Sequence, residues 1–141
     1  MKKRMNITDQ KGGVLVEFAI VLPLLILLIA GILEFGILLY NKHVITNASR
    51  EGARAGIVAE TTDGEIREVV NKFCPNLITF GQDVCPLQPS SIIINDGSGI
   101  ATTGYLKVHV VFDYEFLLPS VLGLGSPIQV AAETVMEMEP T

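Results

Sequence analysis

The sequence has few of the side chains that carry catalysis or bind metal ions. Its 141 residues include only two histidines and two cysteines, and His43 and His109 lie far apart. Cys74 and Cys85 do not form a C-x-x-C pair, so they make a poor zinc site. No G-x-S-x-G motif and no phosphate-binding glycine loop is present. We therefore expect no enzyme activity, cofactor, metal site or small-molecule substrate.

Basic residues are scarce in the C-terminal two thirds of the chain. Residues 41–141 contain twelve acidic and six basic side chains. Binding to nucleic acid requires a basic surface, so this composition argues against a nucleic-acid partner. It leaves calcium or a basic protein partner open, without a specific signal for either.

A long apolar run near the N-terminus is the dominant feature that is present. Gly12–Tyr40 contains sixteen uncharged positions in succession, 18–33, almost all of them apolar. About 20 residues of helix cross the hydrocarbon core of a bilayer, and a single span must be helical to pair its backbone groups. We predict a transmembrane helix over 13–40, in contact with lipid. Pro23 removes one helical hydrogen bond and is expected to kink this helix.

The residues before this run resemble a targeting segment. Residues 1–12 carry four basic side chains against one acid, which favours a cytoplasmic N-terminus and an extracytoplasmic C-terminal domain. A cleaved secretory signal is the main alternative. It is disfavoured because its apolar region is usually about 7–15 residues, whereas this run resumes beyond Glu34 without an A-x-A-like site. Glu34 itself is expected at the hydrated far boundary of the membrane.

Glu17 is a carboxylate within the apolar run. A charge at the bilayer centre costs on the order of 3 kcal/mol on insertion scales and often marks a functional partner. A cut between Gly12 and Gly13 would place a new amine four residues before Glu17. That amine could pair with Glu17 of a neighbouring chain, or within one chain at i, i+4 spacing. Taken alone, the pattern fits an ordinary anchor with its acid at the headgroups equally well.

The helical pattern continues beyond the membrane span. A helix from Val14 to Ile57 would be about 66 Å long, roughly twice the apolar thickness of a bilayer. We predict that 41–58 forms an extracytoplasmic extension, whose small residues allow close packing against the domain that follows.

Residues 59–141 are predicted to form a small ectodomain. A helix over Glu65–Phe73 has Thr62 or Asp63 available as its N-cap, and its pattern places Ile66, Val69, Val70 and Phe73 inward. Period-two alternation then predicts three strands: Ser91–Asn95, Tyr105–Phe116 and Ile128–Glu139. In the second of these it places Leu106, Val108, Val110 and Phe112 on one face, which is expected to be covered. The fold class is therefore α+β, with the long N-terminal helix packed on an antiparallel sheet of three to four strands.

The two cysteines lie within this ectodomain. On an extracytoplasmic segment a disulfide between Cys74 and Cys85 is the natural interpretation. It would stabilise the fold by about 3 kcal/mol in the chain-entropy model.

Several short motifs in fixed order suggest a family. They are Gly12, Glu17-Phe18, Leu22-Pro23-Leu24, Glu34-Phe35-Gly36, Thr46-Asn47-Ala48 and Arg50-Glu51-Gly52-Ala53-Arg54. This run resembles the signature region of TadE-like proteins, pseudopilins of the tight-adherence (Tad) pilus system, strongly over 12–58 and more weakly in the C-terminal third.

The resemblance implies a pilin-like fold and a structural function in a type IV pilus. It implies cleavage by a prepilin peptidase between Gly12 and Gly13, and assembly through Glu17 and Phe18 with other pilins and the pilus assembly platform. The chain would reside in the bacterial cytoplasmic membrane or enter a surface pilus, and support adherence and biofilm formation. The alternative is an uncleaved single-pass anchor for a binding module that uses its strands or loop 95–104.

Overall fold

One long helix dominates the N-terminal part of the chain. The structure is a computed structural model that describes residues 8–58, 61–80, 87, 89–95, 104–118 and 127–138. Helix α1 spans Thr8–Gly56, 49 residues, and so begins before the expected Val14. It continues through Pro23, and no second proline interrupts it before its end at Gly56. The predicted long helix is thus confirmed.

The chain divides into two compact units, Met1–Phe35 and Gly36–Thr141, and α1 runs through the boundary between them. Within the first unit, the side chains of residues 12–29 are all exposed. The second unit contains the hydrophobic core. The boundary between the units, at Phe35 and Gly36, falls inside the predicted membrane span of 13–40. The second unit therefore includes the last turns of that span.

A second, short helix follows α1 directly. Helix α2 spans Asp63–Asn71, and Thr62 is its N-cap. The Thr62 amide donates to Oε2 of Glu65 over 2.8 Å, and the Glu65 amide donates to the Thr62 hydroxyl over 3.4 Å. This capping box satisfies two backbone donors that a helix end leaves unpaired. Of the four residues predicted to face inward, Ile66 and Val70 are buried, and Val69 and Phe73 are half-buried.

The three predicted strands form one antiparallel sheet. Strands β1 (Ile92–Ile94), β2 (Tyr105–Tyr114) and β3 (Ile128–Glu137) lie in the order β1-β2-β3, and each ends slightly inside its predicted range. Short 3₁₀ turns occupy Cys74–Asn76 and Pro89–Ser91. The α+β class is confirmed.

One face of the sheet is buried. On β2, Leu106, Val108, Val110 and Phe112 are buried as the alternation predicted, and Tyr114 joins them. Val108 pairs with Ile94 on one side and Thr134 on the other, so the inner side chains of all three strands lie in one layer. The opposite face carries Lys107, whose ammonium lies 3.2 Å from the Glu133 carboxylate.

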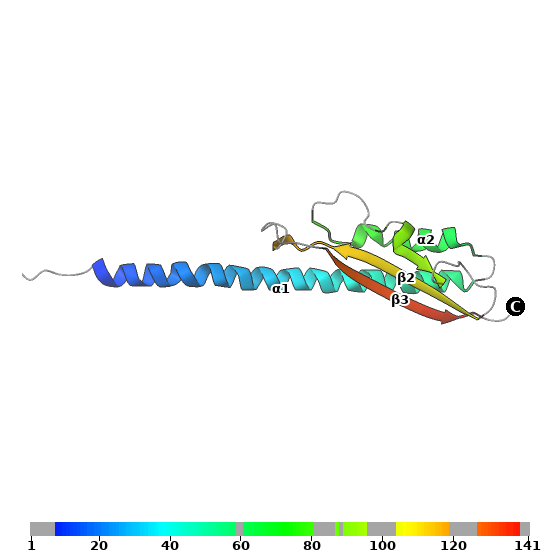
Figure 1. Ribbon diagram of the computed structural model, residues 1–141, viewed down its shortest axis with the longest axis horizontal. Coiled ribbons are helices and arrows are strands. Elements are labelled where there is room, and N and C mark those ends of the chain that lie inside the picture. The colour runs from blue at the N-terminus through cyan, green and yellow to red at the C-terminus, as the bar shows by residue number, and fades with distance from the viewer. Residues whose placement is uncertain are drawn as a thin grey trace, which may run out of the picture. The chain divides into compact units, whose positions relative to one another are not determined.

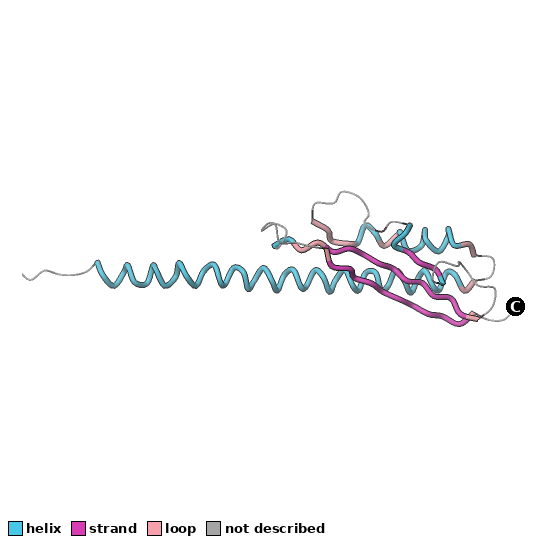
Figure 2. The backbone as a smooth tube through the Cα atoms, in the orientation of Figure 1, coloured by secondary structure: helices cyan, strands magenta, loops and turns pink. Residues whose placement is uncertain are grey.

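Both helices of the second unit cover this inner face (Figure 1, Figure 2). A Cβ added at Gly52 of α1 would lie 2.7 Å from Cγ2 of Val70 in α2 and 3.4 Å from Cγ1 of Val108 in β2. At Gly56 it would meet the side chains of Leu106 and Ile66. The small residues of α1 therefore allow the close approach that the sequence predicted.

Buried polar side chains fix α1 against the rest of the second unit. Asn41 is fully buried; its Nδ2 donates to the Ile78 carbonyl over 2.8 Å, and its Oδ1 accepts from the Ile78 amide over 2.9 Å. Ser49, also fully buried, hydrogen-bonds the Thr134 hydroxyl. Buried polar groups must be paired in this way because an unpaired one costs about 1–3 kcal/mol.

Candidate assembly segment

The predicted processing and assembly residues all lie on the first half of α1. Gly12 and Gly13 are helical, and a Cβ added at either would meet no atom within 4 Å. Phe18 is 61% exposed. The structure therefore brings the cleavage and assembly residues together on one accessible helical segment, where their predicted roles stay untested.

Glu17 is exposed and has no hydrogen bond or ion pair within the part of the chain that the structure describes. Its neighbours Val16 and Phe18 are apolar and equally open, at 61% each. A carboxylate on such a surface, placed in lipid, has neither water nor a protein partner to offset its desolvation. The helix thus presents a carboxylate that has no partner among the described residues.

Pro23 interrupts the hydrogen bonding of this segment without ending the helix. Proline has no N–H, so the Ala19 carbonyl loses the donor that it would otherwise bind. The bend predicted at Pro23 stays a prediction. Membrane helices tolerate such a site because neighbouring helices and local adjustment satisfy the free carbonyl.

Glu34 corrects one sequence-based expectation. The side chain was expected at a hydrated boundary, but it is only 8% exposed. Burial of an acid requires hydrogen bonds or a charge partner, and Glu34 does have an interaction. The sequence could not reveal the burial of Glu34, because a lone acid at the end of an apolar run is typical of a residue at the membrane–water interface.

The cysteines are placed only in part. Cys74 begins the 3₁₀ turn after α2 and is 5% exposed within the core. Cys85 lies outside the described residues, so the disulfide stays a prediction.

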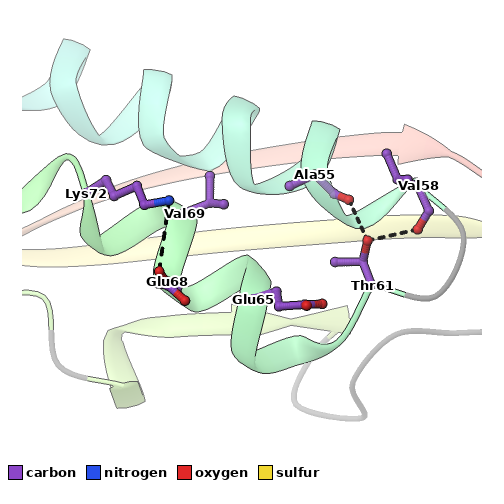
Figure 3. Close-up of a pocket in the computed structure, with 7 residues that line it drawn as sticks. All are labelled: Ala55, Val58, Thr61, Glu65, Glu68, Val69 and Lys72. Carbon is purple, nitrogen blue, oxygen red and sulfur yellow. Dashed lines mark hydrogen bonds and ion pairs between the residues drawn. The ribbon is translucent and has the colours of Figure 1, made fainter.

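A shallow groove lies between the end of α1 and helix α2, far along the chain from Glu17 (Figure 3). Its volume is about 510 Å³, and it is lined by Ala55, Val58, Thr61, Glu65, Glu68, Val69 and Lys72. The Thr61 hydroxyl donates to the carbonyls of Ala55, at 3.0 Å, and Val58, at 2.9 Å, which caps the end of α1.

The acids of this groove already have partners. Hydrogen bonds from the backbone and side chain of Thr62 lower the pKa of Glu65, because they stabilise its charged form. Glu68 pairs with Lys72 over 4.0 Å. Within the described residues, no group of three or more His, Cys, Asp or Glu side chains could hold a metal ion. The groove therefore offers a surface rather than a reactive centre.

Among the described residues, one helix is long and apolar enough to cross a membrane, over Gly12–Gly56. Together with the small α+β unit that packs on its second half, this defines a protein with an N-terminal helix able to span a membrane and a compact C-terminal domain. The model of the TadE-like protein family matches residues 12–54, so the resemblance seen in the motifs is confirmed for that segment. The match indicates a protein associated with the Tad pilus, a system whose TadE-like components are structural.

The matched segment lies entirely within α1 and does not reach the sheet. Neither the curated proteins nor the solved structures contain a match to this chain. The family likeness is therefore carried by the helix that holds both Glu17 and the glycines against which α2 and β2 pack.

Proposed function

We propose that this chain is a minor pseudopilin of a Tad-type pilus, cleaved by a prepilin peptidase after Gly12 and assembled through its N-terminal helix. The observation that carries the proposal is Glu17, an exposed carboxylate without a partner in the described chain, on the apolar helix that matches the TadE-like family. In a helix that packs against other helices such a charge can find a partner, whereas in a simple anchor it depends on water and headgroups at the membrane surface.

Cleavage after Gly12 would supply the missing partner. The new amine on Gly13 would be mostly protonated near neutral pH. In a poorly screened, apolar environment, it would attract Glu17 of the neighbouring subunit strongly and set the stagger between the two helices. The open space around Gly12 and Gly13 supports access for the peptidase.

The residues beside Glu17 suit packing between subunits. Phe18 is exposed and would contact neighbouring helices, and a donor from those helices would satisfy the Ala19 carbonyl that Pro23 leaves free. The partners in this proposal are other pilins and the assembly platform. The N-terminus would be cytoplasmic and residues 41–141 extracytoplasmic, as the basic residues of segment 1–12 predict.

Glu17→Ala tests the proposal, with Glu51→Ala as the matched control. Both changes remove an exposed acid from α1, but Glu51 lies beyond the membrane span and forms only an exposed pair with Arg54 at 3.9 Å. We expect Glu17→Ala to reduce surface piliation or processing while membrane insertion persists, and Glu51→Ala to leave both unchanged. The measurements are pilus counts and the mass of the native N-terminus.

The N-terminal mass separates this proposal from its alternative. A mature chain that starts at Gly13 supports the pseudopilin. A chain that keeps Met1 and retains full piliation with Glu17→Ala would instead support an uncleaved, membrane-anchored binding module.

A further inference from the structure

One end of the second unit carries large apolar side chains that remain exposed. Ile78 is 41% exposed, Phe80 36%, Leu117 45% and Ile128 48%. We call these four residues the apolar rim. They come from three separate segments of the chain: the residues after α2, the residues after β2 and the first position of β3.

Contacts place the rim at a single end of the sheet. Asn41 of α1 holds both backbone groups of Ile78. Phe80 lines a small cavity together with Tyr114, the last residue of β2, and Tyr114 is the register partner of Ile128. Leu117 follows Tyr114 by three positions in the chain.

Two contacts show which residues of α1 lie beside the end of the sheet that carries the apolar rim. The Lys42 ammonium donates to the Ala131 carbonyl, and the Ser49 hydroxyl bonds that of Thr134. Seven helical residues advance by about 10.5 Å, and three strand residues advance by about 10 Å. Between these two contacts, helix α1 and strand β3 therefore run in the same direction and advance by nearly the same distance.

The same rise per residue gives the position along the axis of α1 that lies level with Ile128. Ile128 is three residues before Ala131, a further advance of about 10 Å that corresponds to between six and seven helical residues before Lys42. Ile128 thus lies approximately level with Gly36. The rim therefore lies at the level of the helical turns 36–40, which the sequence assigns to the end of the membrane span.

We propose that the apolar rim lies in the boundary between headgroups and acyl chains of the membrane that α1 spans. The ectodomain would then rest against the bilayer instead of standing away from it. The ligand is the lipid surface itself, because residues at the depth of 36–40 meet lipid on every side that protein does not cover. Exposed apolar side chains gain from removal from water there. The proposal requires only that 13–40 crosses a membrane and goes beyond the function in the pilus.

The chain contains no tryptophan, so one introduced tryptophan reports on one position. The full chain is reconstituted in phosphatidylcholine vesicles with Ile128→Trp or Leu117→Trp as rim reporters. Tyr105→Trp is the matched control, because Tyr105 is 58% exposed at the other end of β2. Emission is measured with brominated lipid chains and, separately, with aqueous iodide, and near-ultraviolet circular dichroism checks that each variant is folded.

We expect both rim reporters to emit at shorter wavelength than the control and to lose more emission with brominated lipid. The control should be quenched by iodide alone. Rim reporters that are as accessible to iodide as the control, and insensitive to brominated lipid, would overturn the proposal. Protection from both quenchers would also overturn it, and would identify a second protein copy as the cover.

Leu27→Trp, within the predicted span, separates a failure of the rim from a failure of the span. Quenching of this reporter by brominated lipid shows that α1 crosses the bilayer. If it is not quenched, the span on which the rim depends is overturned as well. Every reporter shares the same mixture of vesicle orientations, so their ratios can be compared directly.

Discussion

The two halves of α1 differ in composition and in surroundings, because the first half is almost wholly apolar whereas the second carries polar and charged residues such as Lys42, Arg50 and Glu51. Residues 12–29 are exposed on every side of the helix, although nearly all are apolar. In the second half, Ile45, Ala48 and Ala53 are fully buried against the sheet and α2. The first half has the composition of a buried helix but no partner in the described chain, so its sequence is fitted to lipid or to other subunits.

The glycines of the two halves of α1 also differ in their surroundings. A Cβ at Gly31 would meet no atom within 4 Å, whereas one at Gly52 would lie 2.7 Å from Val70. The second half of the helix therefore uses glycine for packing within its own chain. We expect substitutions in the first half to change assembly, and those in the second half to change the free energy of unfolding.

The largest effect should come from a cavity in the second half. Ile45→Ala removes a fully buried side chain, and such changes cost about 2–5 kcal/mol. Leu28→Ala is the matched control, since Leu28 is 58% exposed. Urea unfolding of the full chain in detergent micelles, followed by near-ultraviolet circular dichroism, should show a lower midpoint for Ile45→Ala alone. Equal midpoints would contradict the division of the helix.

A disulfide would reinforce the second unit only. Cys85→Ser removes the predicted bond to Cys74 and should lower the free energy of unfolding by about 3 kcal/mol. Reduction of the native chain should have a similar effect and leave Cys85→Ser unchanged. Titration of thiols in the denatured, unreduced native chain provides the direct test. Two reactive thiols there would contradict the disulfide.

The glycine comparison predicts a smaller effect. Gly52→Val forces Val70 and Val108 to move, and overpacking of this kind costs about 1–3 kcal/mol. Gly31→Val adds the same side chain where there is room, and should leave the unfolding midpoint of the second unit unchanged. Destabilisation of similar size in both variants would show that helix propensity, not packing, sets the cost.

Local periodicity was sufficient to predict much of the fold. The alternation on β2 placed Leu106, Val108 and Phe112 on the buried face, where they lie. The pattern of helix α2 placed Ile66, Val69, Val70 and Phe73 inward; the first and third are buried, and Val69 and Phe73 are half-buried. These features were predictable because the period of each element and the apolarity of its residues agree along a short stretch of sequence.

Features that depend on contacts distant in sequence were not predictable. Asn41 and Ser49 are polar and look solvated in the sequence, yet both are fully buried because Ile78 and Thr134 bind them. Ile128 fits the inward face by alternation but is 48% exposed at the end of the sheet. The partner of Glu17 is harder still, because no described residue of its own chain supplies one.

The smallest expected effect concerns the acid that caps α2. Hydrogen bonds from Thr62 lower the pKa of Glu65 below its ordinary value of 4.5. Because the folded pKa is the lower one, the capping box stabilises the fold fully above the unfolded value, and this contribution is lost as the pH falls through the folded value. Glu65→Gln should therefore unfold with a shallower dependence on pH below 4.5 than the native chain.

Glu68→Gln is the matched control for this measurement. It removes an acid from the same helix, one that forms an exposed ion pair with Lys72 at 4.0 Å. The control should keep the dependence on pH that the native chain shows, since its capping box is intact. The unfolding midpoint is measured in the same micelles at a series of pH values. If Glu65→Gln and the native chain keep parallel profiles as the pH falls, the capping carboxylate does not stabilise α2, and the start of this helix depends on the burial of Ile66 instead.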